Sequence, residues 1–275
     1  MYAIEAETAR SARLYPAGDN IAFARVTLPE TWVYDQADTQ SARQTQYTYG
    51  ESLRLLAKSG DFYHAQSLRD AYSGWLHASA LTLLEHEPAP LPWRTRHVAP
   101  VTRDASMKSP YVATLPPDAC FAIDDEQGDY LHIAQLGWIH HKHAIPADLH
   151  SDIVMTASEH LGRSYIWGGR GVAGLDCSAL AQLSYRRAGR NIPRDSDLQK
   201  HLLHKFHLPV ALDALQAGDL IYLPGHVMIA ATADSVIHAT AAYMQVVFEP
   251  LSVPLTRHRH SGGTDAQIAA YRWRE

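Results

Sequence analysis

The 275-residue sequence has few cysteines, no long apolar run and no long basic run. Its two cysteines, Cys120 and Cys177, are too few for the disulfide scaffold of a small secreted domain. The first twenty residues lack an apolar core flanked by basic residues, and no apolar run approaches the ~18 residues of a membrane-spanning helix. We therefore expect a cytoplasmic protein without a membrane partner, or an extracytoplasmic one if a leader has been removed.

Charge and composition narrow the class of protein further. The formal net charge is −5 with histidine neutral, so nucleic acid is not an expected partner. Hydrophobic residues make up 46% of the chain, which is enough for real cores and argues against disorder. The length favours two or three domains and leaves the oligomeric state open.

The stretch 165–178, YIWGGRGVAGLDCS, carries the strongest chemical signal. Its glycines allow sharp turns and close backbone approach, and a helical pattern follows Cys177 as far as Gly189. The unpaired N–H groups and the dipole at a helix N-terminus favour a thiolate, so Cys177 is a candidate nucleophile. A small, buried and unreactive cysteine is the alternative.

The last 125 residues or so predict helices followed by strands. We expect a helix over 151–161 with Ser151 as its cap, the Cys177 helix, and a short helix after the loop that begins at 191. Strands are expected at 220–223, 226–231, 235–239 and 245–248, with 269–273 closing the sheet. This order is typical of an α+β domain.

Two histidines in the predicted strands complete a catalytic pattern. His226 begins one strand and His238 lies in the next, so antiparallel pairing can bring their side chains together. An imidazole beside Cys177 can take the thiol proton and later give it to the leaving amine. His238 can then act as an acceptor that holds the tautomer and orientation of His226.

The N-terminal half contains an internal repeat. The segment 60–64, GDFYH, corresponds to 128–132, GDYLH, and 74–76, GWL, corresponds to 137–139, GWI. The repeat predicts two copies of a small all-β unit, separated by a proline-rich linker over 85–92. We expect Trp75, Trp138 and Cys120 to be core residues of these units.

Two histidine-rich spots do not predict a metal site. The run 140–143, HHKH, has no standard zinc spacing and is interpreted as a solvated linker. His201, His204 and His207 have helical spacing but no evident cysteine or carboxylate partner. We therefore expect no metal and no cofactor.

The C-terminal motifs resemble the NlpC family of papain-like cysteine peptidases. The resemblance covers roughly 150–250 and is carried by Tyr-x-Trp-Gly-Gly at 165–169, Asp-Cys-Ser at 176–178, Pro-Arg-Asp-Ser at 193–196, Gly-Asp-Leu at 218–220, Gly-His-Val at 225–227 and His-Ala at 238–239. It implies a papain-like fold with Cys177, His226 and His238 as catalytic residues, and hydrolysis of peptide or amide bonds in bacterial cell-wall peptides.

The resemblance also assigns substrate-binding residues. Asp176, Ser178 and Ser196 are implied to line the cleft, with Tyr165 beside the nucleophile. Ala179 stands where the family usually has glycine, and the effect of that methyl group is left open.

The whole architecture resembles γ-D-glutamyl-L-diamino-acid endopeptidases with two bacterial SH3-like domains. It implies an N-terminal arm over 1–30, a first SH3-like domain over 31–87, a linker and second SH3-like domain over 88–147, and the peptidase domain over 148–275. In this family an acidic residue and a tyrosine of the first SH3-like domain hold the free amine of an N-terminal L-alanine. Glu51 and Tyr72 match those positions, and a carboxylate and a phenol suit an ammonium group.

These resemblances predict a γ-D-glutamyl-L-diamino acid endopeptidase that acts on released murein peptides in recycling. The preferred diamino acid, diaminopimelate or lysine, the permitted length of the stem peptide and the role of the second SH3-like copy stay open. Two other functions are also open: an amidase or acyltransferase that uses the same cysteine, and a non-catalytic module that binds wall peptides.

Overall fold

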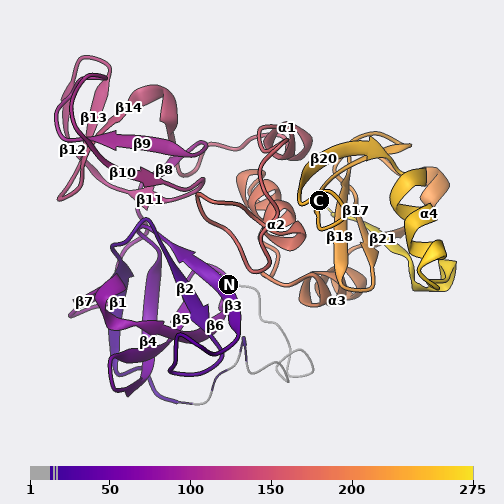
Figure 1. Ribbon diagram of the computed structural model, residues 1–275, viewed down its shortest axis with the longest axis horizontal. Coiled ribbons are helices and arrows are strands. Elements are labelled where there is room, and N and C mark those ends of the chain that lie inside the picture. The colour runs from indigo at the N-terminus through magenta and orange to yellow at the C-terminus, as the bar shows by residue number, and fades with distance from the viewer. Residues whose placement is uncertain (1–12, 15, 17, 275) are drawn as a thin grey trace. The chain divides into compact units, whose positions relative to one another are not determined.

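The computed structural model describes residues 13–14, 16 and 18–274, so residues 1–12, 15 and 17 of the predicted N-terminal arm lie outside the described residues. The chain forms two compact units (Figure 1). One, here called the β unit, extends to Leu149 and also includes Arg170–Val172. The other, called the α+β unit, contains His150–Gly169 and Ala173 to the C-terminus. The order of antiparallel β domains followed by an α+β domain confirms the predicted fold class.

The first half of the β unit is a seven-stranded antiparallel sheet in the order β3-β2-β6-β5-β4-β1-β7. Inward-facing aliphatic residues such as Leu53, Leu55 and Leu76 fill its core. The predicted arm over 1–30 contributes a strand here, because β1 pairs with both β4 and β7. The first domain therefore begins before residue 31. Its strands are β1 Ala22–Val26, β2 Glu30–Tyr34, β3 Arg43–Thr48, β4 Ser52–Ser59, β5 Phe62–Ser67, β6 Ser73–His77 and β7 Leu81–Leu84, with a short 3-10 helix η2 Ala78–Ala80.

The second half of the β unit consists of a five-stranded sheet, β10-β9-β14-β13-β12, and a three-stranded sheet, β11-β8-β15. Phe121, Ile133 and Ile139 belong to its core. Cys120 is buried, as expected for the second copy. The strands are β8 Trp93–Thr95, β9 Ala99–Thr102, β10 Tyr111–Leu115, β11 Cys120–Phe121, β12 Ile123–Gln127, β13 Tyr130–Ile133, β14 Gly137–His140 and β15 Ala144–Pro146, with 3-10 helix η3 His141–His143.

The internal repeat appears in the structure as the same register in both halves. His64 is paired with Trp75 across β5 and β6, and His132 is paired with Trp138 across β13 and β14. The ring centroids lie 5.1 Å apart in the first pair and 4.9 Å apart in the second. The two halves of the β unit thus share the same cross-strand pairs, which confirms the predicted duplication of a small all-β domain.

The two tryptophans are not core residues, contrary to the prediction from sequence. Trp75 and Trp138 are half-buried, and their rings contact those of their histidine partners at tilts of 32° and 50°. Because side chains alternate across a strand, the following residues, Leu76 and Ile139, face the core and are fully buried.

The α+β unit is built on a six-stranded antiparallel sheet in the order β16-β21-β17-β18-β19-β20. The predicted C-terminal strand is confirmed next to β17, and β16 extends the sheet beyond it. The strands are β16 Leu208–Val210, β17 Leu220–Leu223, β18 His226–Ala230, β19 Ser235–Thr240, β20 Gln245–Pro250 and β21 Ala269–Arg272, with 3-10 helices η4 Leu212–Ala214 and η5 Asp265–Gln267.

Four α-helices accompany this sheet: α1 Ile153–Ser158, α2 Cys177–Arg187, α3 Ser196–Phe206 and α4 Ser252–His260. α1 is shorter than predicted and is capped by Asp152 instead of Ser151, because the Asp152 carboxylate accepts the Met155 N–H. α2 begins at Cys177 and ends before Gly189, as the sequence predicts; Gly189 has φ +76°.

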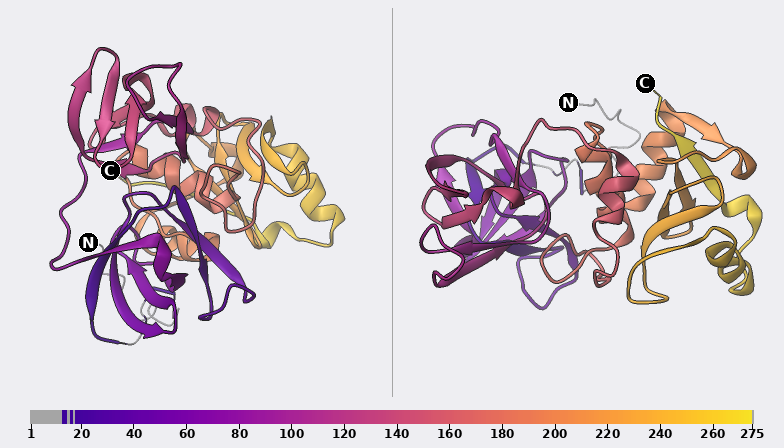
Figure 2. Two further views of the ribbon diagram at one scale, coloured as in Figure 1. Left: turned by 60° about the vertical axis from the view of Figure 1, so that its left-hand side comes forward. Right: turned by 90° about the horizontal axis from the view of Figure 1, so that it is seen from above.

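The sheet buries a different set of residues on each face. Figure 2 shows the strands and helices from two further directions. Val227, Ile229 and Ile237 belong to the core shared with α2, which packs against β18 and β19. Met228 and Leu255 belong to the core shared with α4. Alternation along β18 and β19 therefore gives each helix its own hydrophobic surface and leaves the strand ends free to carry polar side chains.

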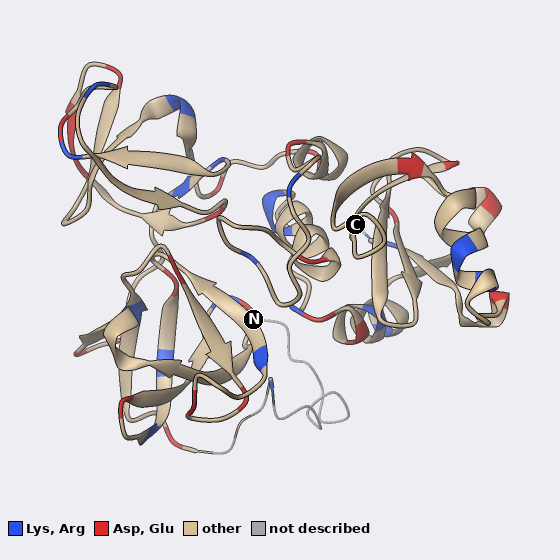
Figure 3. Cartoon of the chain, viewed as in Figure 1, with Lys and Arg blue, Asp and Glu red and all other residues tan. Residues whose placement is uncertain are grey.

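No helix in the described part of the chain is long and apolar enough to cross a membrane. Acidic and basic residues are interspersed along the described elements of each unit (Figure 3).

Candidate active site

Cys177 is the first residue of α2, and a tight loop delivers it there. Gly168 has φ +74°, a backbone conformation that glycine adopts without strain, and its N–H donates to the Asp176 carboxylate at 2.9 Å. The backbone at Gly174 approaches the carbonyl oxygen of Ser164 so closely that a Cβ would lie 2.5 Å from it. The glycines predicted to shape this loop are therefore required by its geometry.

A buried ion pair fixes the loop to the start of α2. The Arg194 guanidinium donates to both carboxylate oxygens of Asp176, at 2.9 and 2.8 Å, and to the Ser178 hydroxyl at 2.8 Å. Asp176 also caps α2 by accepting the Ala179 N–H at 2.8 Å. Arg194 is fully buried and Asp176 is 6% exposed, so each charge loses its hydration and the interaction between the two groups offsets that loss.

The sulfur of Cys177 lies in a buried environment that favours the thiol. Burial is the largest effect and, with the nearby charge of Asp176, raises the pKa of Cys177 to about 12. The Val227 N–H, the Arg194 charge and the Ser178 N–H act in the opposite direction on this pKa. The depressed thiol pKa expected at a helix N-terminus is therefore outweighed by desolvation.

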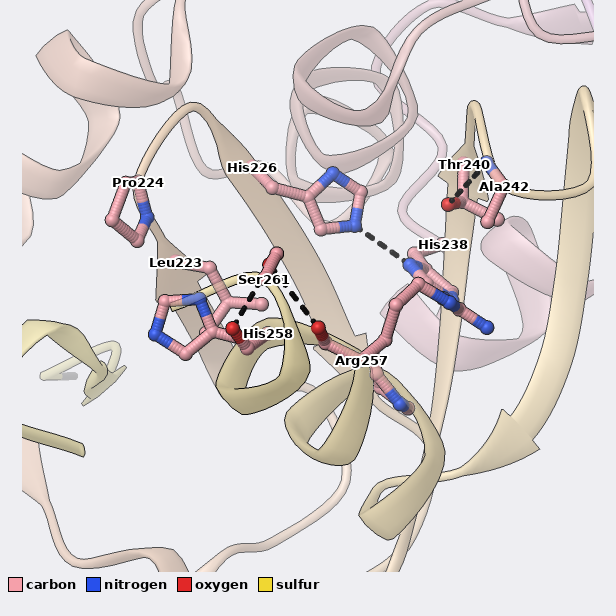
Figure 4. A pocket seen from close by; sticks show the side chains of 10 residues that line it. Leu223, Pro224, His226, His238, Thr240, Ala242, Arg257, His258 and Ser261 are labelled. Carbon is pink, nitrogen blue, oxygen red and sulfur yellow. Dashed lines mark hydrogen bonds between the residues drawn. The ribbon is translucent and has the colours of Figure 1, made fainter. Parts of the chain in front are cut away.

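The two predicted histidines lie together at the end of the sheet nearest the sulfur. Val227, whose N–H faces the sulfur, directly follows His226. Strands β18 and β19 pair in antiparallel register, and His226 Nε2 lies 2.7 Å from His238 Nδ1. Figure 4 shows the second ring nitrogen of His226 pointing away from His238. Cys177, His226 and His238 thus lie in the same α+β unit, and their catalytic roles stay a prediction.

The Glu249 carboxylate, which the sequence did not indicate, lies next to His238. Glu249 on β20 places Oε1 2.9 Å from His238 Nε2. Its other oxygen accepts the Tyr243 hydroxyl at 3.1 Å, and Arg257 of α4 donates to that hydroxyl at 3.2 Å. Arg257 Nη1 also lies 3.6 Å from Glu249 Oε1.

Burial keeps both histidines neutral near pH 7. Desolvation, followed by the charge of Arg257, lowers the pKa of His238 to about 4. Desolvation, His238 and Arg257 lower the pKa of His226 to about 3, although Glu249 and Asp176 oppose this shift. A neutral imidazole is the form that can accept a proton from a thiol.

A pocket of about 230 Å³ opens beside the histidine pair (Figure 4). Its lining contains His226 and His238 and, from the α4 segment, Arg257, His258 and Ser261. No carboxylate is among the described residues of this lining. The pocket therefore suits a group that accepts hydrogen bonds or carries negative charge.

The other predicted binding residues of the α+β unit differ in accessibility. Tyr165 is half-buried, and burial together with Cys177 and Asp176 raises its pKa to about 12, which places it near the nucleophile. Ser178 is buried and bonds to Asp176 and Arg194. Ser196, half-buried, is the first residue of α3. Asp176 and Ser178 thus shape the site through protein contacts.

The two residues predicted to hold an amine, Glu51 and Tyr72, lie in the β unit around the Tyr47 phenol. Tyr72 is buried, and its carbonyl accepts the Tyr47 hydroxyl at 2.8 Å. Glu51 is 2% exposed and accepts hydrogen bonds from the Ser67 hydroxyl at 2.6 Å and the Thr48 N–H at 3.1 Å.

Two arginines already balance the charge of Glu51. Arg69 lies 3.4 Å and Arg170 3.7 Å from its oxygens. Burial alone would raise the pKa of Glu51, but these charges and the hydrogen bonds outweigh it and leave the pKa below its ordinary value. An incoming ammonium group would therefore share Glu51 with these arginines or displace one of them.

The segment Arg170–Val172 is held by several polar groups of the β unit. The Arg170 N–H donates to Gln46 at 2.8 Å, and its guanidinium lies 3.4 Å from Asp70. The Val172 N–H donates to Glu30, and a Cβ on Gly171 would collide with the same carboxylate. This segment is a fitted part of the β unit and was not predicted to be so.

Sequence reasoning missed Arg194, Glu249 and Arg170 as parts of these networks. Arg194 belongs to the Pro-Arg-Asp-Ser motif, so the motif itself was the available signal. Glu249 directly follows the strand expected at 245–248, with no motif around it. Only the pairing of β19 with β20, which includes Glu249, brings it opposite this part of the sheet. Arg170 lies between glycines and has no periodic pattern.

Comparison with protein families identifies two segments of the chain. The NlpC/P60 family matches residues 162–263, and the bacterial dipeptidyl-peptidase SH3 domain matches residues 33–81. The first range contains the cysteine and both histidines, and the second contains Glu51 and Tyr72.

Two curated relatives share the name gamma-D-glutamyl-L-lysine dipeptidyl-peptidase. The relative from Bacillus cereus is 26% identical over 246 residues, which cover 77% of this chain and 71% of the relative. The relative from Bacillus subtilis is 26% identical over 207 residues, which cover 67% of this chain and 65% of the relative. The match thus covers about two thirds of the length of these two relatives.

Among solved structures, a crystal structure of an NlpC/P60 family protein from Bacillus cereus has a TM-score of 0.75. It is 19% identical in sequence, and the match covers 92% of this chain and 99% of that chain. At this identity the likeness establishes the fold.

Proposed function

We propose that the chain is a cysteine peptidase acting on peptidoglycan stem peptides. The proposal is supported by the match of residues 162–263 to the NlpC/P60 family and of residues 33–81 to the bacterial dipeptidyl-peptidase SH3 domain. The proposed bond joins γ-D-glutamate to an L-diamino acid in peptides whose N-terminal L-alanine has a free amine. One observation carries the proposal: Cys177 begins α2, its sulfur faces the Val227 N–H, and the neighbouring His226 contacts His238 at 2.7 Å.

The chemistry follows from the protonation states of these groups. Neutral His226 takes the proton of the Cys177 thiol as the sulfur attacks the γ-carbonyl carbon of D-glutamate. The bond between this carbon and the diamino acid nitrogen breaks, and His226 returns the proton to the leaving amine. Water then hydrolyses the thioester, which restores the thiol and releases the L-Ala-D-Glu part of the peptide. The Cys177 N–H, in the first turn of α2, has no partner within the helix and can donate to the oxyanion.

We assign recognition of the free amine to Glu51 and Tyr72. A buried carboxylate whose pKa is held low stays ionised and can pair with an ammonium group. A requirement for a free amine would restrict the enzyme to released peptides, and a role in murein peptide recycling follows. The cytoplasmic location expected from the sequence stays a prediction.

The test is a cleavage assay followed by mass spectrometry. The substrates are L-Ala-γ-D-Glu-meso-diaminopimelate, the same peptide acetylated on alanine, and the lysine analogue. Wild type should cleave after D-glutamate only when the amine is free, and Cys177→Ala should cleave none of them. Cleavage of no substrate by wild type would favour transfer chemistry or a binding module.

The role of Glu51 is tested with Glu51→Gln, using Glu126→Gln, an exposed carboxylate on β12, as the matched control. We expect Glu51→Gln to raise KM for the free-amine peptide and to reduce the preference over the acetylated peptide, whereas the control leaves both unchanged. Equal cleavage of free and acetylated peptide by wild type would remove the amine clamp and keep the nucleophile. An equal loss on both peptides would instead assign Glu51 to holding Arg170.

A further inference from the structure

The histidine pair can exist in two arrangements of its protons, and only one of them makes a useful base. In one arrangement His226 carries its proton on Nε2 and donates to His238 Nδ1, which leaves His226 Nδ1 bare. In the other, the proton lies on His226 Nδ1, and the nitrogen that should accept the thiol proton is blocked. The 2.7 Å contact between the rings is compatible with both arrangements.

Glu249 removes this ambiguity. An ionised carboxylate has no proton to donate, so the 2.9 Å contact with His238 Nε2 requires the proton to lie on that nitrogen. His238 Nδ1 is then bare and accepts a hydrogen bond, so His226 must carry its proton on Nε2. His226 Nδ1 is consequently free, and it is the nitrogen that points away from His238 in Figure 4.

Two neighbours hold Glu249 in this role. Arg257 donates to the Tyr243 hydroxyl at 3.2 Å, which commits the hydroxyl proton of Tyr243 to Glu249 Oε2 at 3.1 Å. The Arg257 guanidinium lies 3.6 Å from Oε1, so a positive charge faces this oxygen. Glu249 itself is 7% exposed, so little water competes for either oxygen.

We propose that Glu249 is a positioning residue that acts through His238 to fix the tautomer of His226, the catalytic base, and to stabilise its charged form during the reaction. The inference rests on the proposed function only in taking His226 as the base. When His226 becomes an imidazolium, it donates a hydrogen bond to His238, and His238 donates one to Glu249. The negative charge of Glu249 then stabilises the positive charge of His226 through His238. No proton needs to leave His238 for this effect.

Under this proposal, Glu249→Gln should reverse the tautomers of both histidines. Tyr243, still committed as a donor, selects the amide oxygen of the new side chain, and the amide NH₂ then faces His238 Nε2. His238 must accept that hydrogen bond, so its proton moves to Nδ1 and the proton of His226 moves to its own Nδ1. We expect kcat to fall about 10- to 150-fold, the range for loss of a hydrogen bond to a charged group, with KM little changed.

Removing the Tyr243 hydroxyl should partly rescue this variant. In Glu249→Gln/Tyr243→Phe the amide is free to turn its oxygen towards His238, which restores the productive tautomer. The double variant should therefore be more active than Glu249→Gln. Tyr243→Phe alone should lose less than about 10-fold, the lower limit for Glu249→Gln, because the removed hydroxyl contacts Glu249 Oε2 and not the histidine pair. A merely structural role for Glu249 predicts that the double variant is at least as impaired as the single one, and that result would overturn the proposal.

A spectroscopic measurement tests the same point without substrate. Nitrogen NMR of ¹⁵N-histidine-labelled protein distinguishes protonated from bare ring nitrogens, and His226→Gln and His238→Gln variants assign the signals. In wild type we expect His226 to be protonated at Nε2 and bare at Nδ1, and in Glu249→Gln the reverse. An unchanged tautomer in Glu249→Gln, or a wild-type proton on Nδ1, contradicts the proposal even if the peptides named above prove to be the wrong substrates.

Discussion

Replacing Arg194 by methionine should destabilise the α+β unit far more than loss of one surface charge would. Methionine keeps much of the volume but removes the fork that bonds both oxygens of Asp176, the Ser178 hydroxyl and the Gly169 carbonyl, the last at 3.3 Å. Asp176, 6% exposed, is then left as a buried charge without its counterion. Breaking a buried pair in this way costs about 3 to 5 kcal/mol, which corresponds to an opening constant about 150- to 4000-fold larger.

Hydrogen–deuterium exchange with mass spectrometry reports this change locally. Exchange of a peptide covering α2, Cys177–Arg187, should accelerate by that factor, and a peptide covering β4, Ser52–Ser59, serves as the internal reference in the β unit. The matched control is Arg259→Met, because Arg259 pairs with Asp265 at 2.7 Å on the surface. We expect the control to leave the exchange of α2 unchanged.

A second variant separates the unpaired charge from lost packing. In Asp176→Asn/Arg194→Met no charge is left buried, so part of the lost stability should return. The reasoning would be refuted if Arg194→Met behaved like Arg259→Met, or if the two substitutions at 176 and 194 simply added their costs.

Three further outcomes are expected. Burial sets the pKa of His226 at about 3 and that of His238 at about 4, below the ~6.5 of a free imidazole. Because the unfolded chain binds more protons between these values, the stability of the α+β unit should be full above about pH 6.5 and decline towards pH 3. Urea midpoints that do not differ between pH 7 and pH 4.5 would contradict this. Because burial raises the pKa of Cys177 to about 12, its alkylation by iodoacetamide, followed by peptide mapping, should keep accelerating from pH 6 to pH 9; a plateau already present at pH 5 would indicate a resting thiolate. Leu76→Ala should lower the free energy of unfolding by about 2 to 5 kcal/mol and Trp75→Ala by less, because Leu76 is fully buried and Trp75 is half-buried. Urea unfolding of the two variants measures both losses, and a larger loss for Trp75→Ala would indicate that Trp75 is a core residue.

The predictions from sequence were strongest where a local pattern determines the structure. The helix from Cys177 was confirmed because glycines, an aspartate cap and an apolar stripe all act within twenty residues or so of one another. The repeat was confirmed because its turns and cross-strand pairs recur at fixed spacing.

The predictions failed where a residue's role depends on distant parts of the chain. α4 has no apolar stripe and contains Pro254 in its first turn, where proline is tolerated, so nothing in the local pattern announced a helix. Glu249 becomes a partner of His238 only through strand pairing, and the balance between the helix dipole and desolvation at Cys177 depends on what buries the sulfur.

Arg170–Val172 belong to the β unit although they lie between two segments of the α+β unit, and this affects how the chain can be divided. The polypeptide leaves the α+β unit after Gly169 and returns to it at Ala173, so no single cut separates the two units. A chain shortened to begin at His150 would retain these three residues but lose Glu30, Gln46 and Asp70, their polar partners. The loop before the nucleophile would then lack these hydrogen bonds and this ion pair. Point substitutions are therefore better suited than truncation to studying the two units of this chain.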